Sequence, residues 1–139
     1  MTPANPNDKV AQGLREQPLT ISMAQVRDLL IVTLPPDLSD KIMDEVALQV
    51  GERLSRRSSR AVIVDVTAVS MLDGADYLAL EQIGSRNHML GAATTVIGIA
   101  PGVAAYLAQL PNEPRFLSFA QDMGRALRMH EPSRPGPRA

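Results

Sequence analysis

The chain of 139 residues contains no cysteine and no tryptophan, and aromatic residues make up only 3% of it. Without cysteine there is no disulfide, no thiol nucleophile and no zinc site of the usual composition. Hydrophobic residues still amount to 45%, which is enough to bury the core of one domain. That core has to be built from Ala, Val, Leu, Ile and Met.

An excess of charge of one sign is also lacking, because 14 Lys and Arg face 15 Asp and Glu, for a formal net charge of −1. Nucleic-acid binding relies on clustered cations that displace counterions, so we expect no nucleic-acid partner. No apolar run approaches the length of about 18 residues that a membrane-spanning helix needs. Residues 1–18, MTPANPNDKVAQGLREQP, also lack the apolar core of a signal peptide. We therefore expect a cytoplasmic, single-domain protein without a membrane partner.

Both ends of the chain differ in composition from its middle. Residues 1–17 are polar, and residues 131–139, EPSRPGPRA, are rich in proline. Such segments bury too little apolar area to offset the entropy lost on ordering. We expect a flexible N-terminal segment over 1–17, one domain over 18–130 and a disordered tail over 131–139.

Apolar residues within this domain recur with two different periods. Short β-branched runs bounded by turn residues indicate strands, whereas apolar residues at every fourth position, from Ile42 to Leu54, indicate a helix. The order is β-β-α-β-α-β-α-β-α, which predicts an α/β fold with largely parallel pairing and right-handed crossovers. The expected strands are Leu19–Met23 and Leu29–Leu34, which form a hairpin, followed by Ala61–Val66, Thr94–Ile99 and Phe116–Phe119. The expected helices begin at Ser39 or Asp40, run from Gly74 to Leu90 with Gly91 as a cap, lie between Pro101 and Pro111, and span Gln121–Met129. The inward residues are expected to be Ile42, Val46, Val50 and Leu54 in the first helix and Met123, Ala126 and Leu127 in the last.

The sequence offers no convincing catalytic or metal-binding set. Its only histidines, His88 and His130, are far apart and lack the spacing of metal ligands. We expect both on the surface, and no serine lies in a nucleophile motif. We accordingly expect neither an enzyme nor a bound metal or cofactor.

The segment after the strand Ala61–Val66 is the most informative part of the chain. It crosses a short loop and enters a helix at Asp73-Gly74. Asp73 is expected to cap that helix and Asp76 to lie in its first turn, where negative charge is favoured. Asp65, at the end of the strand, either fixes the following loop or faces a partner.

A helical wheel of residues 75–90 separates two faces. One face gathers apolar residues that we expect to pack against the sheet. The other carries Gly84, which costs a helix about 1 kcal/mol relative to Ala. We interpret this face as a docking surface that lets a partner approach closely; the alternative is that the residues drifted without function or that the face is a buried flank. The inward residues are expected to be Ala75, Leu78, Ala79, Ile83, Met89 and Leu90, and the exposed ones Tyr77, Leu80, Glu81, Gly84 and His88.

Three segments together resemble the STAS domain family, over about residues 18–130: VIVDVTAVSMLDG, the LGA after the second helix, and VIGIAPGVAAYL. That family includes anti-sigma-factor antagonists and the small scaffold proteins of stressosomes, which the chain resembles most. The resemblance implies a small mixed sheet with helices mainly on one side.

In the family, the residue after the aspartate that opens the second helix is usually a Ser or Thr, and a partner kinase phosphorylates it. The aspartate matches as Asp73, but the acceptor position is Gly74. A second regulatory threonine of scaffold proteins falls at Tyr106. The chain departs from the family at both positions, and Thr67 and Ser70 are candidate substitutes.

The resemblance implies a non-catalytic interaction module that binds a switch kinase or an anti-sigma-type ATPase of the histidine-kinase-like class. It also implies assembly with other STAS proteins as a homo- or hetero-oligomer, in signal transduction and stress response. Partner-binding residues would be Asp73, Gly74, Tyr77, Glu81 and Gly84. The alternative is a STAS-fold ligand-binding or transporter-associated regulatory module with a nucleotide or lipid-handling partner.

Overall fold

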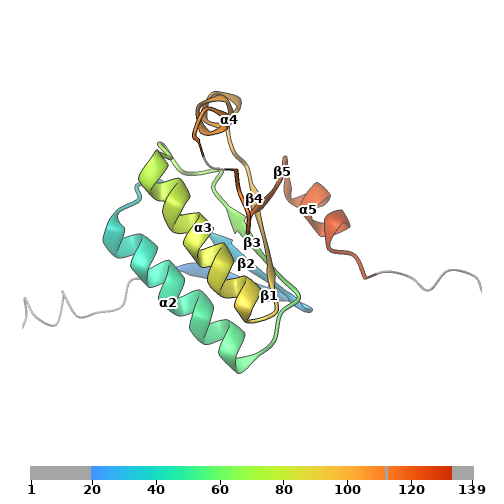
Figure 1. Cartoon of the computed structure of the whole chain (residues 1–139). Coiled ribbons are helices and arrows are strands. Elements are labelled where there is room, and N and C mark those ends of the chain that lie inside the picture. The colour runs from blue at the N-terminus through green and yellow to red at the C-terminus, as the bar shows by residue number, and fades with distance from the viewer. Residues whose placement is uncertain (1–19, 112, 133–139) are drawn as a thin grey trace, which may run out of the picture.

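The computed structural model describes residues 20–111 and 113–132. The segment 1–17 and the tail beyond Pro132, for which we expected flexibility and disorder, lie outside the described residues. In chain order, and with the labels of Figure 1, the elements are β1 (Ser22–Val26), β2 (Leu29–Thr33), α2 (Asp40–Arg56), β3 (Ala61–Asp65), α3 (Gly74–Met89), β4 (Ala93–Ile97), α4 (Pro101–Ala108), β5 (Ser118–Ala120) and α5 (Met123–Met129).

The five strands form one sheet in the order β1-β2-β3-β4-β5. β1 and β2 are antiparallel, and each later strand pairs in parallel with the one before it. The predicted hairpin is confirmed, but β1 runs to Val26 and turns at Arg27, whose φ of 56° is left-handed. The helices supply the crossovers that parallel neighbours require. The predicted α/β class with a mixed sheet is therefore confirmed.

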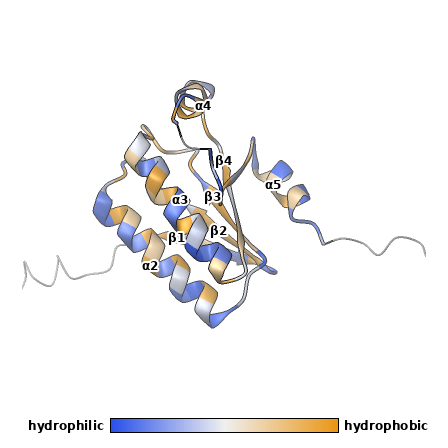
Figure 2. Cartoon of the chain, in the orientation of Figure 1, coloured by the Kyte–Doolittle hydropathy of each residue, from blue (hydrophilic) through white to orange (hydrophobic). Residues whose placement is uncertain are grey.

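The sheet is covered on both faces, more thickly on one. α2 and α3 lie side by side over one face, and α5 lies on the other, with α4 at the end of the sheet (Figure 1). The strands are mostly orange in Figure 2, whereas α2 and α3 mix apolar and polar segments. Leu30, Val62 and Val96 belong to the larger core, under α2 and α3. Ile63 and Ala126 belong to the smaller core, under α5.

α2 follows its predicted pattern closely. Ser39 caps it by accepting a hydrogen bond from the backbone N–H of Ile42 at 3.1 Å. The buried stripe consists of Met43, Val46, Val50 and Leu54. Ile42, which we expected in that stripe, is only half-buried.

The predicted faces of α3 are wrong for most of their residues, although Ile83 is buried and His88 is exposed as expected. Leu78, Met89 and Leu90 are exposed, although we expected them to face the sheet. The residues that are buried are Tyr77, Leu80, Ile83, Gly84 and Asn87. Asn87, which we assigned to neither face, donates through its Nδ2 to the buried Thr94 hydroxyl at 2.9 Å. A satisfied amide of this kind is as acceptable in a core as an apolar side chain.

The last elements match the expected types with shifted bounds. α4 begins at Pro101 as predicted, and Gly91 after α3 has the expected left-handed φ of 84°. In α5, Ala126 is buried as expected, but Leu127 is exposed. Among the described residues, no helix combines the length and apolar character that crossing a bilayer requires.

Candidate functional site

The loop between β3 and α3 is fixed at the carboxyl ends of the parallel strands. The Asp65 carbonyl accepts from the N–H of Leu34, and the N–H of Val66 donates to the Ile97 carbonyl, both at 3.0 Å. The Asp65 carboxylate accepts from the backbone N–H of Thr67 at 2.9 Å and also binds its hydroxyl. Asp65 therefore fixes the loop, one of the two roles that its position in the sequence allowed.

Asp73 and Asp76 close the N-terminus of α3 through a reciprocal capping box. The Asp73 carboxylate accepts from the N–H of Asp76 at 2.8 Å, and the Asp76 carboxylate accepts from the N–H of Asp73 at 3.2 Å. The first of these bonds is the main reason why the pKa of Asp73 is lowered. Burial raises the pKa of Asp76, with the Asp73 charge acting in the same direction. Asp73 thus carries the charge that stabilises the helix N-terminus.

Gly74 opens α3 beside the exposed side chain of Tyr106 from α4. A Cβ at position 74 would lie 3.7 Å from the Tyr106 hydroxyl, an ordinary van der Waals contact. The structure thus brings together Gly74 and Tyr106, the two positions at which the chain differs from what the sequence resemblance implies. Position 74 also has room for a small side chain, so its glycine is not imposed by packing.

Glu81 is tied to the chain itself instead of standing free on a surface. One of its carboxylate oxygens accepts from the backbone N–H of Arg115 at 2.7 Å and from that of Phe116 at 3.0 Å. The carboxylate therefore anchors the segment that leads into β5. Hydrogen bonds to an ionised acceptor are stronger than neutral ones.

Gly84 does permit a close approach, but of the same chain. A Cβ there would lie 2.7 Å from the Phe116 carbonyl oxygen and 3.0 Å from a Leu117 methyl group. Tyr77 is also buried, and burial raises its pKa. The expectation that Tyr77 and Gly84 are exposed is therefore wrong, because the segment 113–117 covers this side of α3.

The exposed surface next to Gly74 contains residues that the helical wheel placed elsewhere. Leu78 is 55% exposed one turn after Gly74. It lines a depression of about 680 Å³ together with Gly74, Glu81, Leu110 and Arg115. Met71 in the preceding loop is also exposed. Asn87 and Leu78 lie on opposite sides of the helix. Placing Asn87 on the inward face would therefore have predicted that Leu78 is exposed.

The candidate substitutes for the missing hydroxyl lie in the loop, before the helix begins. Ser70 is exposed, and its backbone N–H donates to the Pro36 carbonyl at 2.9 Å. Thr67 is exposed as well, and its hydroxyl is bonded to Asp65. Neither occupies the first position of α3.

The two histidines differ from each other. His88 is exposed as expected, and its ring lies 5.4 Å from that of Phe116. His130 is half-buried, in contrast to our expectation, and its Nε2 lies 2.7 Å from the Thr95 hydroxyl. Burial, aided by the Arg60 charge, lowers the pKa of His130. Within residues 20–111 and 113–132, no group of three or more His, Asp or Glu side chains could hold a metal ion.

Comparison with known proteins identifies the fold. No protein-family model matches the chain, and no curated protein does. Among solved structures, an RsbS variant from Moorella thermoacetica is 18% identical, with a TM-score of 0.67 over 78% of this chain and 92% of that one. A structure of the stressosome, described as a signal integration and transduction hub, is 19% identical, with a TM-score of 0.67 over 78% and 94% of the two chains.

A third solved structure carries the domain's name. An anti-sigma-factor antagonist (STAS) domain protein from Planctomyces limnophilus is 12% identical, with a TM-score of 0.63 over 80% of this chain and 98% of that one. The chain therefore has the STAS fold, as the sequence resemblance implied.

Proposed function

We propose that this chain is a non-catalytic STAS interaction module that docks a switch kinase or an anti-sigma-type ATPase at the N-terminus of α3. The observation that supports this most is the surface itself: a rigidly capped helix start, followed by an exposed Leu78, on a STAS fold. We define the docking surface as Asp73, Gly74 and Leu78. Tyr77, Glu81 and Gly84 hold this surface in place from beneath instead of contacting the partner.

The proposed module lacks the usual charge switch. Phosphorylation of a hydroxyl at position 74 would add a charge of about −1.5 to −2 next to the Asp73 and Asp76 carboxylates. The repulsion and the cost of desolvating that charge would oppose partner binding. Gly74 has no hydroxyl, so the surface stays in its binding-competent form, and assembly with other STAS proteins is not released by modification at this residue.

The docking surface can be tested with two leucines of equal exposure. Leu78 on α3 and Leu48 on α2 are each 55% exposed, so Leu78→Asp and Leu48→Asp add the same charge at different places. The tagged full chain and both variants are used to capture proteins from the native lysate, followed by mass spectrometry. We expect a histidine-kinase-like ATPase or other STAS proteins to be recovered with the parent chain and with Leu48→Asp, and lost with Leu78→Asp.

Two results would contradict the proposal. Recovery of the same ATPase with Leu78→Asp would move the docking surface away from α3. Recovery of transport components alone would favour the transporter-associated alternative.

The missing switch can be restored by substitution. Gly74→Ser introduces the hydroxyl in a position with room for it, and Gly74→Ala introduces the same Cβ without the hydroxyl. Once the kinase has been recovered, it is incubated with both variants and ATP. We expect Gly74→Ser to be phosphorylated at position 74 and then to bind the kinase at least tenfold more weakly, equivalent to about 1.4 kcal/mol. Gly74→Ala is expected to remain unphosphorylated and to bind the kinase as the parent chain does. Unmodified Gly74→Ser with unaltered binding would refute the assignment of position 74.

A further inference from the structure

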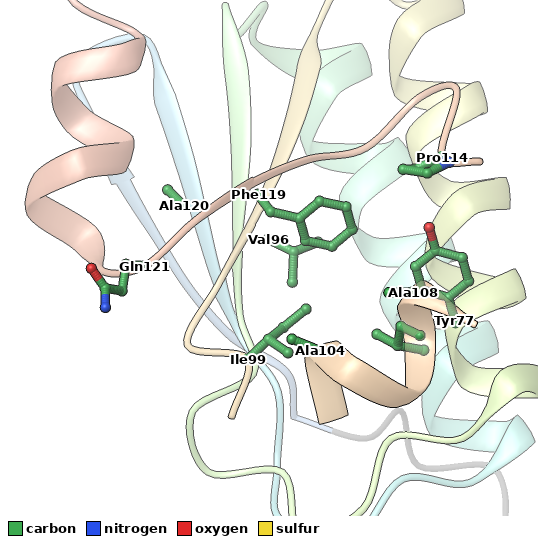
Figure 3. A pocket seen from close by; sticks show the side chains of 10 residues that line it. Tyr77, Val96, Ile99, Ala104, Ala108, Pro114, Phe119, Ala120 and Gln121 are labelled. Atoms are coloured by element: carbon green, nitrogen blue, oxygen red, sulfur yellow. The ribbon is translucent and has the colours of Figure 1, made fainter. Parts of the chain in front are cut away.

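An apolar pocket lies between α3, α4 and the end of the sheet, on the other side of Tyr77 from the depression that contains Gly74 and Leu78. Its volume is about 370 Å³, within the range of about 300–1,000 Å³ that is typical of small-molecule sites. Figure 3 shows side chains converging on it from β4, α4 and the strand that follows. The lining residues used in the argument are Tyr77, Ile99, Ala104, Leu107, Ala108 and Phe119.

The lining is aromatic on one side and uncharged throughout. The rings of Tyr77 and Phe119 are 6.4 Å apart between centroids, with planes within 8° of each other, and they lie next to each other in Figure 3. Near-parallel rings of this kind present aromatic faces on which a planar ring system stacks favourably. None of the described residues that line the pocket carries a charge, and Gln121 contributes an amide. Burying a charged ligand here without a partner would be costly.

α4 covers the pocket incompletely. Its sequence, PGVAAYLA, is almost wholly apolar, yet no residue of this fully described helix is buried. A surface helix normally buries its apolar stripe against the core. Leu107 is only half-buried and Ala104 and Ala108 are exposed, and all three line the cavity, so apolar area of α4 faces it that an occupant would cover.

We propose that this pocket binds a neutral, flat, ring-containing small molecule stacked on Tyr77 and Phe119. Gln121 lies at the edge of the pocket, apart from the two rings in Figure 3. This site does not depend on the proposed docking function, and its ligand is neither a nucleotide nor an acidic lipid, because no lining cation would neutralise their charge.

Two fluorescent probes with the same rings and different charge test the chemistry. N-phenyl-1-naphthylamine is neutral, and 8-anilinonaphthalene-1-sulfonate is an anion. The protein has no tryptophan, so its own fluorescence interferes little. Titrated into the full chain, the neutral probe is expected to bind saturably with one site, and the anionic probe at least tenfold more weakly.

Substitutions on α4 locate the binding site. Ala104 and Ala108 are exposed at the pocket, whereas Ala105 on the same helix does not line it. Ala104→Leu and Ala108→Leu each fill the pocket, and each is expected to lower the affinity for the neutral probe at least tenfold. Ala105→Leu adds the same side chain at an equally tolerant helical position and is expected to change nothing.

Several outcomes would overturn this proposal. One is the absence of saturable binding of the neutral probe, and another is equally tight binding of the anionic probe. Undiminished binding to both pocket-filling variants would place the site elsewhere. A dimer in sedimentation that Ala104→Leu dissociates and Ala105→Leu preserves would show that a second copy covers the pocket.

Discussion

Helices α2 and α3 lie side by side on the same face of the sheet (Figure 1), but they are packed in different ways. α2 buries one narrow stripe, from Met43 to Leu54, and its other sides carry mostly charged and polar residues. α3 is buried toward the sheet and also beneath the segment 113–117, which contacts Glu81 and Gly84. Consequently α2 has one inward face, whereas α3 is enclosed from two directions.

This difference in packing explains why a glycine and a glutamate in α3 make contacts with another segment, whereas the glycine in α2 does not. In α2, Gly51 has nothing within 4 Å of a Cβ, so its glycine serves no packing purpose. In α3, Gly84 is where another segment crosses, and Glu81 holds that segment. Because α3 is also contacted by the segment 113–117, it uses a glycine and a glutamate for contacts within the protein.

The largest expected effect separates the two sides of α3. Leu80 is 1% exposed and Leu78 is 55% exposed. Leu80→Ala is expected to lower the free energy of unfolding by about 2–5 kcal/mol, because it leaves a cavity in the core. Leu78→Ala should change it by no more than about 0.5 kcal/mol. Urea denaturation followed by circular dichroism measures both, and equal losses would contradict the observed orientation of α3.

Substituting alanine for one glycine in each helix should change the free energy of unfolding in opposite directions. Gly84→Ala would place its Cβ 2.7 Å from the Phe116 carbonyl oxygen, and we expect a loss of about 1–3 kcal/mol from overpacking. Gly51→Ala meets no atom and is expected to gain about 0.5–1 kcal/mol from helix propensity. Both unfolding free energies come from the same denaturation experiment. If Gly84→Ala were also stabilising, the segment at Phe116 would be freer to move aside than the contact implies.

Most of the fold could be predicted from the sequence, because its signals are local. The near-continuous apolar run Ala61–Val66 predicted a strand, and Pro101 and Gly91 marked helix ends through their own backbone preferences. The buried stripe of α2 could be predicted from the apolar period because only one side of that helix is buried. Boundaries such as the start of β1 shifted because pairing with β2 determines them.

The candidate site could be predicted only in part. Asp73 as a cap follows from its place before the helix, and the structure confirms it. The approach of Tyr106 to Gly74 joins residues 32 positions apart (106 − 74), and nothing in the local pattern around either residue indicates it. The faces of α3 were misjudged because the wheel had no information about the segment 113–117.

A smaller effect concerns the anchor on α3 and a similar glutamate on α2. Glu81 binds two backbone N–H groups of another segment, whereas Glu45 accepts from the Gln49 side chain, one turn along its own helix, at 3.0 Å. Glu81→Ala is expected to cost about 1–2 kcal/mol, since two backbone donors lose a charged acceptor. Glu45→Ala should cost only a few tenths, about 0.2–0.5 kcal/mol. Amide exchange at Arg115 and Phe116 should accelerate in Glu81→Ala alone, and unchanged protection there would contradict the anchoring role.

The smallest effect is a stabilisation that is lost in acid, and it distinguishes the two helix caps. Asp73 caps α3 with a carboxylate whose pKa is lowered below 3.8, chiefly by the hydrogen bond from the Asp76 N–H, whereas Ser39 caps α2 without a charge. A lowered folded-state pKa gives stability that is present above pH 3.8 and is lost as the pH falls through the folded-state value. Asp76 acts in the opposite direction, because its pKa is raised. We therefore compare melting temperatures of the parent chain and Asp73→Ser between pH 6 and pH 2, since serine keeps the cap and removes the charge. The difference between the two should shrink steadily below pH 3.8, while Ser39→Ala should lower the melting temperature by the same amount at every pH. A constant offset for Asp73→Ser would show that the Asp73 charge contributes nothing to the start of α3.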